Sequence, residues 1–174
     1  MYQYKREPLN NEEIDRLVNA CKNLKEKLVV WTLLDTGMRV SEFANIKKEE
    51  IQWQEGRIII YGKGGPYGKK SKRRVIPMSP RIKKLFELYF VEHDEIDFSV
   101  RTIQRLIKRI ANKAIISKKV SPHVLRHTFA IMCIRRGIST RALMGLMGHD
   151  NLSTTEIYLN MSPEDIMKEF KEKW

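Results

Sequence analysis

The segment SPHVLRHTFAIMCIRRG, residues 121–137, constrains the fold more than any other, because it predicts a helix that is apolar on two opposite faces. At about 100° per residue, Leu125 and Phe129 lie on one face of this helix. Ala130 and Ile134 lie on the opposite face. A helix with apolar residues on both sides needs neighbours on both sides. The segment therefore predicts a buried helix at the centre of the fold.

The first turns of this helix carry the polar side chains of His123, Arg126 and His127. Ser121 followed by proline is typical of a helix start, where backbone N–H groups favour an anion. Three interpretations fit this cluster on its own: a metal site, a solvated basic turn, or a site for anion binding or catalysis. The metal site is the weakest of these, because Arg126 would place a positive charge beside the ion.

The other segments predict a mainly α-helical α+β fold in which a small antiparallel sheet interrupts the helices. The sheet is expected from β-branched runs on either side of Glu55-Gly56, followed by a strand at 75–79. The chain has 174 residues and no internal repeat, which predicts a single domain over residues 1–174. Helices are expected from Glu12 onward, over 28–37 and 38–46, after Pro80, and over 99–114, 139–147, 152–159 and 163–173.

The charge balance predicts a polyanionic partner. Lys plus Arg number 33 against 21 Asp plus Glu, which gives a formal net charge of +12. A surplus of this size favours nucleic acid as the partner, with an anionic membrane surface as the second choice. No apolar run approaches the length of about 18 residues that spans a bilayer, so no membrane insertion is expected.

The two cysteines, Cys21 and Cys133, are expected to be buried thiols in a reduced, cytoplasmic protein. They lack CxxC spacing and therefore predict no zinc site. The N-terminal segment has no apolar stretch after its basic residues, so no signal peptide is expected. No metal and no cofactor are expected.

Two further segments carry reactive side chains whose roles are ambiguous when each is taken alone. TGMRVSE places Arg39 and Glu42 at positions i and i+3, which is most often a surface salt bridge. MGHDNLSTTEIYL places His149 after a glycine and Tyr158 nine residues later. A single tyrosine in a helix is more often a packing residue than a nucleophile.

Taken together, these segments resemble the tyrosine recombinases, the phage-integrase and Xer family. The resemblance rests on TGMRVSE, GKG, HVLRHTFA and GH, followed nine residues later by tyrosine, in the order and spacing of the family. It covers nearly the whole chain and implies the fold of a tyrosine recombinase catalytic domain. EPLNNEEIDRL resembles the start of the family's catalytic half. The separate N-terminal core-binding domain of the family is therefore expected to be absent, as in a fragment or a truncated member.

The resemblance implies a role for each matching residue. Tyr158 would attack a DNA phosphodiester and become linked to the 3′-phosphate. Arg39 and Arg126 would hold the non-bridging oxygens, for which the planar guanidinium fork is suited. His123 and His149 would serve as hydrogen-bond donors or proton carriers. A phosphotyrosine ester keeps the bond energy, so no ATP is expected. The two arginines and two histidines would stabilise the developing charge, so no metal is expected either.

The loop GKGGPYGKKSKRR would supply the proton for the departing 5′-hydroxyl. Lys63 matches the family's lysine, but this loop is longer than usual, which leaves Lys69, Lys70 and Lys72 as alternatives. The other cations of the loop, Arg73 among them, are expected to contact phosphates. Two residues would have supporting roles, namely Glu42, which would orient Arg39, and His127.

Double-stranded DNA is thus the expected partner, and the basic helix over 99–114 is an expected DNA-binding surface, although a solvated face is the alternative. Its candidate residues are Arg101, Arg105, Lys108 and Arg109. The resemblance also implies a homo-oligomer on DNA, a dimer on one site and a tetramer in synapsis. The helix over 163–173 would then dock on a neighbouring protomer, or else pack within its own chain.

Two alternatives of other kinds remain open at this point. A non-catalytic DNA-binding module would keep the basic surface and show salt-dependent affinity without cleavage. A type IB topoisomerase-like enzyme would share the chemistry but relax DNA without site preference. The expected location is the cytoplasm, at the nucleoid or in a host cell if the protein is viral.

Overall fold

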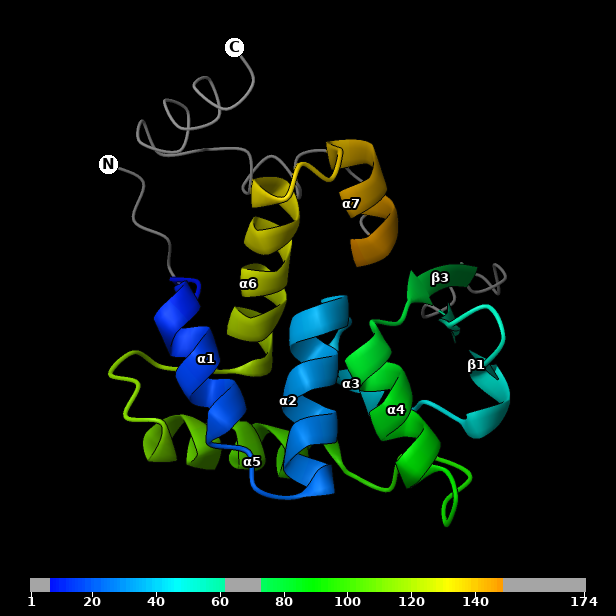
Figure 1. Cartoon of the computed structure of the whole chain (residues 1–174), viewed down its shortest axis with the longest axis horizontal. Coiled ribbons are helices and arrows are strands. Elements are labelled where there is room, and N and C mark those ends of the chain that lie inside the picture. Colours follow the sequence, from blue (N-terminus) through cyan, green and yellow to red (C-terminus); the bar gives the residue numbers. More distant parts are fainter. Residues whose placement is uncertain (1–6, 62–72, 149–174) are drawn as a thin grey trace, which may run out of the picture.

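The computed structural model describes residues 7–61 and 73–148, and these residues form a mainly helical domain with one small sheet (Figure 1). The expected helices over 152–159 and 163–173 lie outside the described residues. The helices are α1 (Asn11–Asn19), α2 (Leu24–Thr36), α3 (Val40–Phe43), α4 (Pro80–Tyr89), α5 (Val100–Lys113), α6 (Pro122–Arg135) and α7 (Thr140–Met147), with a short 3-10 turn over Lys48–Glu50. The strands are β1 (Ile51–Gln52), β2 (Arg57–Tyr61) and β3 (Arg73–Pro77).

Two helices form the centre of the fold. The α6 helix is buried from Val124 to Ala130, which confirms the prediction made from its two apolar faces. The α2 helix lies beside it and is buried to a similar extent, with Leu28 and Leu33 fully inaccessible to solvent. The helices α1, α4 and α5 surround α2 in Figure 1.

The helix ends follow capping chemistry that is visible in the sequence. Asn10 accepts a hydrogen bond from the backbone of Glu13, whose side chain bonds back to the Asn10 backbone. Asn23 caps α2 in the same position, so this helix begins four residues before the predicted start at 28. The polar first turn LKEK hides that start from an argument based on apolar periodicity. The predicted helix over 38–46 shortens to α3, with Arg39 at its N-cap.

The sheet is antiparallel in the order β1–β2–β3, as predicted. In its register Ile58 faces Ile76 and Ile60 faces Arg74. Successive side chains of a strand point to opposite faces, so Arg74 shares a face with the buried Ile76. The neighbouring Arg73 is exposed. This alternation directs Arg74 away from solvent.

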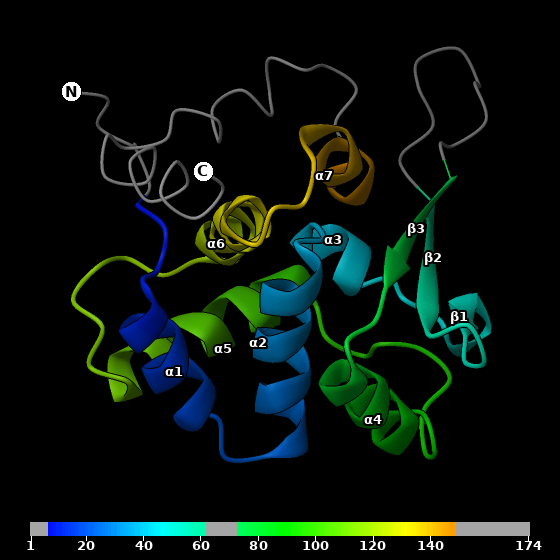
Figure 2. The same cartoon turned by 45° about the horizontal axis from the view of Figure 1, so that its top comes forward.

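The α7 helix docks on α6 through a small apolar cluster that is separate from the main core. Its buried members are Phe129, Ala130, Cys133, Leu143 and Met147. In Figure 2, α7 lies above α3, between α6 on the left and β3 on the right, and it contacts both α6 and β3. Three segments far apart in sequence thus meet at the end of α7.

Both cysteine thiols are buried, as expected. Burial raises the pKa of Cys21 to about 12 and that of Cys133 to about 11. Both therefore remain protonated at neutral pH and are poor nucleophiles. Within the described ranges, no helix is long and apolar enough to cross a membrane.

Candidate active site

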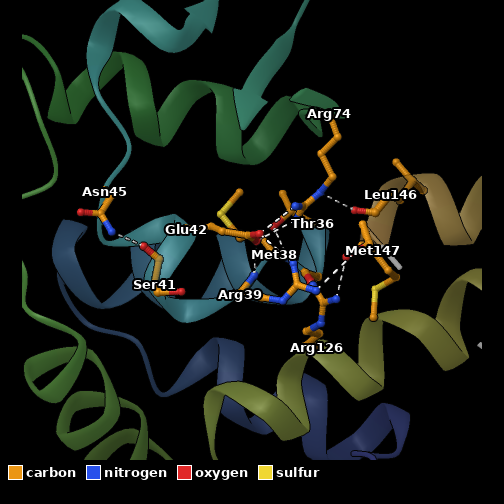
Figure 3. Close-up of polar contacts among 12 residues, drawn as sticks. Thr36, Met38, Arg39, Ser41, Glu42, Asn45, Arg74, Arg126, Leu146 and Met147 are labelled. Carbon is orange, nitrogen blue, oxygen red and sulfur yellow. Dashed lines mark hydrogen bonds and ion pairs between the residues drawn. The ribbon is translucent and has the colours of Figure 1, made fainter. Parts of the chain in front are cut away.

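Three arginines from three different elements converge on the C-terminal end of α7 (Figure 3). Each guanidinium donates a hydrogen bond to a backbone carbonyl there. The last carbonyls of a helix carry partial negative charge and lack partners within the helix, so cations stabilise them. The donors are Arg74 Nε, Arg126 Nη2 and Arg39 Nη2, and their acceptors are the carbonyl oxygens of Leu146 (3.2 Å), Met147 (2.7 Å) and Gly148 (3.3 Å).

Arg126 lies on α6 and is 7% exposed, which is unusual for arginine. Its Nη1 donates to the carbonyl oxygen of Gly37, the residue that ends α2. Gly37 has a φ of +59°, and a Cβ atom there would overlap the Phe129 ring. The two carbonyls therefore fix the plane of a buried guanidinium between α2 and α7.

Arg39 and Glu42 form the i, i+3 pair predicted from TGMRVSE. Arg39 Nη1 donates to Glu42 Oε1 at 3.0 Å, and the Arg39 backbone N–H donates to Oε2 at 2.6 Å. The Arg39 side chain is 46% exposed, whereas that of Glu42 is only 9% exposed. The carboxylate thus orients an arginine that faces solvent.

Arg74 is the residue of this site that the sequence reasoning did not single out. It holds both oxygens of Glu42 in a two-pronged contact, Nη1 to Oε1 at 2.7 Å and Nη2 to Oε2 at 2.6 Å. The signal that could have identified it is the strand alternation of RRVIP, which places Arg74 on the same face as Ile76. The surrounding run of lysines and arginines obscured this signal.

The pKa of Glu42 is lower than its ordinary value. Burial by itself raises this pKa, but the hydrogen bonds from Arg74 and from Arg39 outweigh the burial. Glu42 is therefore a carboxylate at neutral pH.

The two histidines of α6 lie in different environments. His123 is exposed and lines a cleft of about 520 Å³, together with Val40, Gln104 and Lys119. His127 lies one turn further along and is 7% exposed. Burial, with a smaller effect of His123, lowers the pKa of His127 to about 4. His127 is thus a neutral, interior side chain, whereas His123 faces the cleft.

The four candidate DNA-binding cations of the basic helix α5 are exposed on one broad side, and one of them is held by an ion pair. The exposed residues Arg101, Arg105 and Lys108 share a face with Gln104, which lines the cleft beside His123. Arg109 is also exposed but is paired, with Nη2 at 3.1 Å from Glu26 Oε1 on α2. The cleft therefore adjoins one basic face of α5, while Arg109 bonds to the neighbouring helix.

The remaining predicted residues lie outside the described ranges. These are Lys63, Lys69, Lys70, Lys72, His149 and Tyr158. His149 directly follows Gly148, the last of the three carbonyl residues bound by arginine. In residues 7–61 and 73–148 no group of three His, Cys, Asp or Glu side chains could hold a metal ion.

Comparison with known proteins identifies relatives over almost the entire chain. The sequence profile of the phage integrase family matches residues 7–165. The tyrosine recombinase XerA of Pyrococcus horikoshii is 33% identical over 172 residues, which cover 91% of this chain and 58% of the relative. XerA of Saccharolobus solfataricus is 31% identical, with 93% of this chain and 55% of the relative covered. The chain thus spans a little more than half the length of these relatives.

The fold agrees with solved structures of the same kind. A crystal structure of XerA recombinase matches with a TM-score of 0.84 at 29% identity, covering 99% of this chain and 65% of that one. The catalytic domain of bacteriophage HP1 integrase matches with a TM-score of 0.71 at 23% identity, covering 97% and 96%. The match over residues 7–165 includes every residue of the site described above. The chain therefore belongs to the phage integrase family of tyrosine recombinases.

Proposed function

We propose that the chain is the catalytic domain of a site-specific DNA recombinase or integrase. It breaks and rejoins DNA strands by transesterification through a 3′-phosphotyrosine intermediate. The observation that carries this proposal is the convergence of Arg39 and Arg126 at the end of α7, directly before His149. Two arginines fixed next to a histidine are a pre-organised site for a phosphate whose charge grows during reaction.

The nucleophile in this proposal is the Tyr158 hydroxyl, which attacks the scissile phosphorus and expels the 5′-oxygen of the next nucleotide. Arg39 and Arg126 stabilise the non-bridging oxygens. Lys63, or one of Lys69, Lys70 and Lys72, delivers a proton to the leaving oxygen. Reversal by a second 5′-hydroxyl rejoins the strand, so the number of phosphodiester bonds is conserved without ATP.

His123 and His149 complete the pocket as donors or proton carriers. The geometry of α6 supports this role for His123, which lines the cleft beside Val40, the residue after Arg39. A helix N-terminus adds backbone N–H groups that favour an anion. His127 is buried and has a supporting role in α6.

The cleft also supports DNA as the partner. The basic face of α5 continues from this cleft through Arg101, Arg105 and Lys108. Related folds have been solved with DNA, including the Tn1549 transposon integrase with circular intermediate DNA and XerH recombinase bound to difH substrate. We extend DNA binding to this chain, with Arg73 and the loop lysines as further phosphate contacts.

Assembly on DNA as a dimer per site and a tetramer in synapsis is part of the same proposal, as is action in the cytoplasm, at the nucleoid or in a host cell. A helix over 163–173 would supply the contact between protomers. Mixing Tyr158→Phe with Arg126→Ala protein on half-site DNA tests this arrangement. Restored cleavage in the mixture requires that one protomer donates its tyrosine to another.

The test of the proposed chemistry is covalent capture of DNA. The full chain is incubated with a pool of short nicked duplexes of randomised sequence, and DNA that stays attached to protein in detergent is sequenced. A nick just 3′ of the cleavage point lets the short fragment that carries the released 5′-hydroxyl diffuse away, which traps the adduct. We expect adducts enriched in particular sequences, and none with Tyr158→Phe.

Two results would contradict the proposal. Adducts formed equally by Tyr158→Phe would assign the attack to another group. Salt-dependent DNA binding without any adduct would support the non-catalytic DNA-binding module instead.

A further inference from the structure

We propose that Arg74 is a positioning residue of the active site, which holds Glu42 and the end of α7 in the arrangement that cleavage requires. This inference rests on the proposed function. Arg74 contacts no reacting group in the proposed chemistry, so its action passes through Glu42, Arg39 and the peptide before His149. Arg74 saturates the Glu42 carboxylate, lies in a largely buried contact with it, and also reaches α7.

Arg74 completes the hydrogen bonding of Glu42. Oε1 accepts from Arg39 Nη1 and from Arg74 Nη1, and Oε2 accepts from the Arg39 backbone and from Arg74 Nη2. A carboxylate has about four acceptor positions, so this carboxylate is saturated. Without Arg74, half of these positions would open to the neighbouring Arg39 guanidinium. The Arg39 guanidinium would then turn toward Glu42. Its N–H donors would bond to the carboxylate instead of to the DNA phosphate.

The contact differs from an ordinary surface ion pair. The Arg74 and Glu42 side chains are 12% and 9% exposed, so solvent screens their attraction weakly. The guanidinium meets the carboxylate with two parallel N–H donors, which fixes direction as well as distance. A pair of this kind holds one geometry, which is what positioning of a neighbouring group requires.

Arg74 also ties β3 to α7. Its Nε donates to the Leu146 carbonyl at 3.2 Å, while its other nitrogens hold Glu42. The guanidinium packs against Gly148 so closely that a Cβ atom there would lie 2.8 Å from Nη1. Gly148 has a φ of +63°, so it turns the chain at the point where His149 follows. The backbone of Gly148, the residue before His149 in sequence, is thus packed against Arg74.

Arg74 lies on one of the two elements that border the residues proposed to transfer protons, and it contacts the other. β3 is the strand that follows the loop with Lys63, and α7 is the helix that precedes His149. One side chain therefore joins the elements that flank the leaving-group lysine and the second histidine. Loss of Arg74 is expected to slow cleavage while leaving DNA affinity almost unchanged.

The experiment compares Arg74→Gln and Arg74→Lys with the full-length wild-type chain on one nicked duplex recovered from the covalent capture. The single-turnover rate of adduct formation and the equilibrium affinity for the same duplex are measured separately. For Arg74→Gln we expect a rate loss of about 100-fold, the size of effect that a small misplacement of reacting groups causes. The expected change in affinity is no more than about threefold, because Arg74 is not a phosphate contact.

Arg81→Gln is the matched control. Arg81 grips Asp35 in the same two-pronged manner, with Nε at 2.7 Å from Oδ2, and joins α4 to α2. The substitution removes the same charge and the same kind of ion pair outside the site. We expect its cleavage rate to stay within about threefold of wild type, since the site's guanidinium groups keep their partners.

Arg74→Lys keeps the inference testable if the glutamine variant does not fold. Lysine keeps the charge beside Glu42, but one ammonium group lacks the planar fork that also reaches Leu146. We expect a folded protein that cleaves at least 10-fold more slowly than wild type. Cleavage at the wild-type rate by a folded Arg74→Lys or Arg74→Gln protein would overturn the inference, as would a rate loss that merely follows lost affinity. If the wild type forms no adduct, the proposed function fails first and the role of Arg74 fails with it.

Discussion

The guanidinium of Arg74 and the carboxylate of Glu42 meet through two parallel hydrogen bonds of 2.7 and 2.6 Å, although 32 residues separate them in sequence. This pair links the short helix that carries Arg39 to the strand that follows the basic loop. Because the Glu42 carboxylate is saturated, a substitution of Arg74 or of Glu42 affects all the groups that donate to this carboxylate. The electrostatics of the site therefore depend on Glu42 being charged.

Glu42→Gln is expected to destabilise the protein by about 3 kcal/mol at neutral pH, because it leaves a buried guanidinium without its counter-charge. The pKa of Glu42 is lowered in the folded state, so its charge stabilises the fold above the ordinary pKa of a glutamate. That contribution is lost as the pH falls through the lowered pKa. Unfolding by urea at several pH values measures the difference between wild type and variant.

The difference in free energy of unfolding should be largest near pH 7 and should shrink below about pH 4. Glu87, an exposed residue of α4, offers a control, since Glu87→Gln is expected to change stability little at any pH. A difference between wild type and Glu42→Gln that stays constant from neutral to acidic pH would contradict this account.

Gly37→Ala is expected to destabilise the fold by about 3 kcal/mol, through left-handed backbone strain and overlap with Phe129. Gly56 separates these two causes, because it has a similar φ of +61° but no atom within 4 Å of an added Cβ. Gly56→Ala should therefore cost only about 1 kcal/mol. Thermal unfolding of both variants gives the comparison. Equal losses would mean that the Phe129 contact adds nothing.

Gly37→Ala should also reduce cleavage more than its stability loss explains. The Gly37 carbonyl accepts from Arg126 Nη1, and a displaced carbonyl turns the guanidinium away from its plane. A variant that is fully folded at low temperature but cleaves slowly would fit this expectation. Wild-type cleavage by that folded variant would show that Arg126 does not depend on Gly37.

Much of the fold followed from local chemistry that the sequence displays. Asn10, Ser99, Ser121 and Ser139 cap their helices, as these residue types favour, and the two apolar faces of α6 did place it at the centre. The start of α2 was predicted four residues late, because a polar first turn carries no apolar period. The local signal for that start is the Asn23 cap, which apolar periodicity does not detect.

The contacts of the site also differ in whether local sequence patterns predict them. Arg39 and Glu42 are three residues apart, so their contact was predictable from helical spacing. Strand alternation marks Arg74 as facing inward, but no local pattern identifies Glu42 as its partner, because that contact depends on β3 packing beside α7. The histidines at the start of α6 differ in burial, with His123 exposed at the cleft and His127 buried, although helical spacing places both on one face. The difference in burial of the two rings depends on the elements that pack against α6 rather than on the sequence of this segment.

His127→Ala and His123→Ala are expected to have opposite consequences. His127 has a lowered pKa of about 4, so the unfolded chain binds a proton more readily between about pH 6.5 and pH 4. Wild-type stability should therefore fall across this window by a few kcal/mol, and His127→Ala should lack that fall. Loss of the buried ring should also lower stability at neutral pH. Urea unfolding at pH 7, 5.5 and 4 measures both effects.

His123→Ala should leave the free energy of unfolding almost unchanged, because the ring is exposed at the cleft. Its adduct formation should be slowed by about 100-fold, the scale of a lost proton carrier or donor. If His127→Ala slows cleavage as strongly while remaining folded, His127 belongs to the reacting groups and its supporting role is wrong.

Arg105→Gln and Arg109→Gln test whether an arginine of α5 that is already held by a carboxylate contributes to DNA binding. Arg105 lies on the face that continues from the cleft, whereas Arg109 is held by Glu26. Arg105→Gln should weaken binding for all sequences and reduce the slope of log affinity against log salt by about 1, as expected for one lost phosphate contact. Arg109→Gln should leave that slope unchanged, because Glu26 already occupies its guanidinium. Fluorescence anisotropy with one labelled duplex at several salt concentrations gives both slopes, and a lower slope for Arg109→Gln alone would show that Arg109, rather than Arg105, contacts a phosphate.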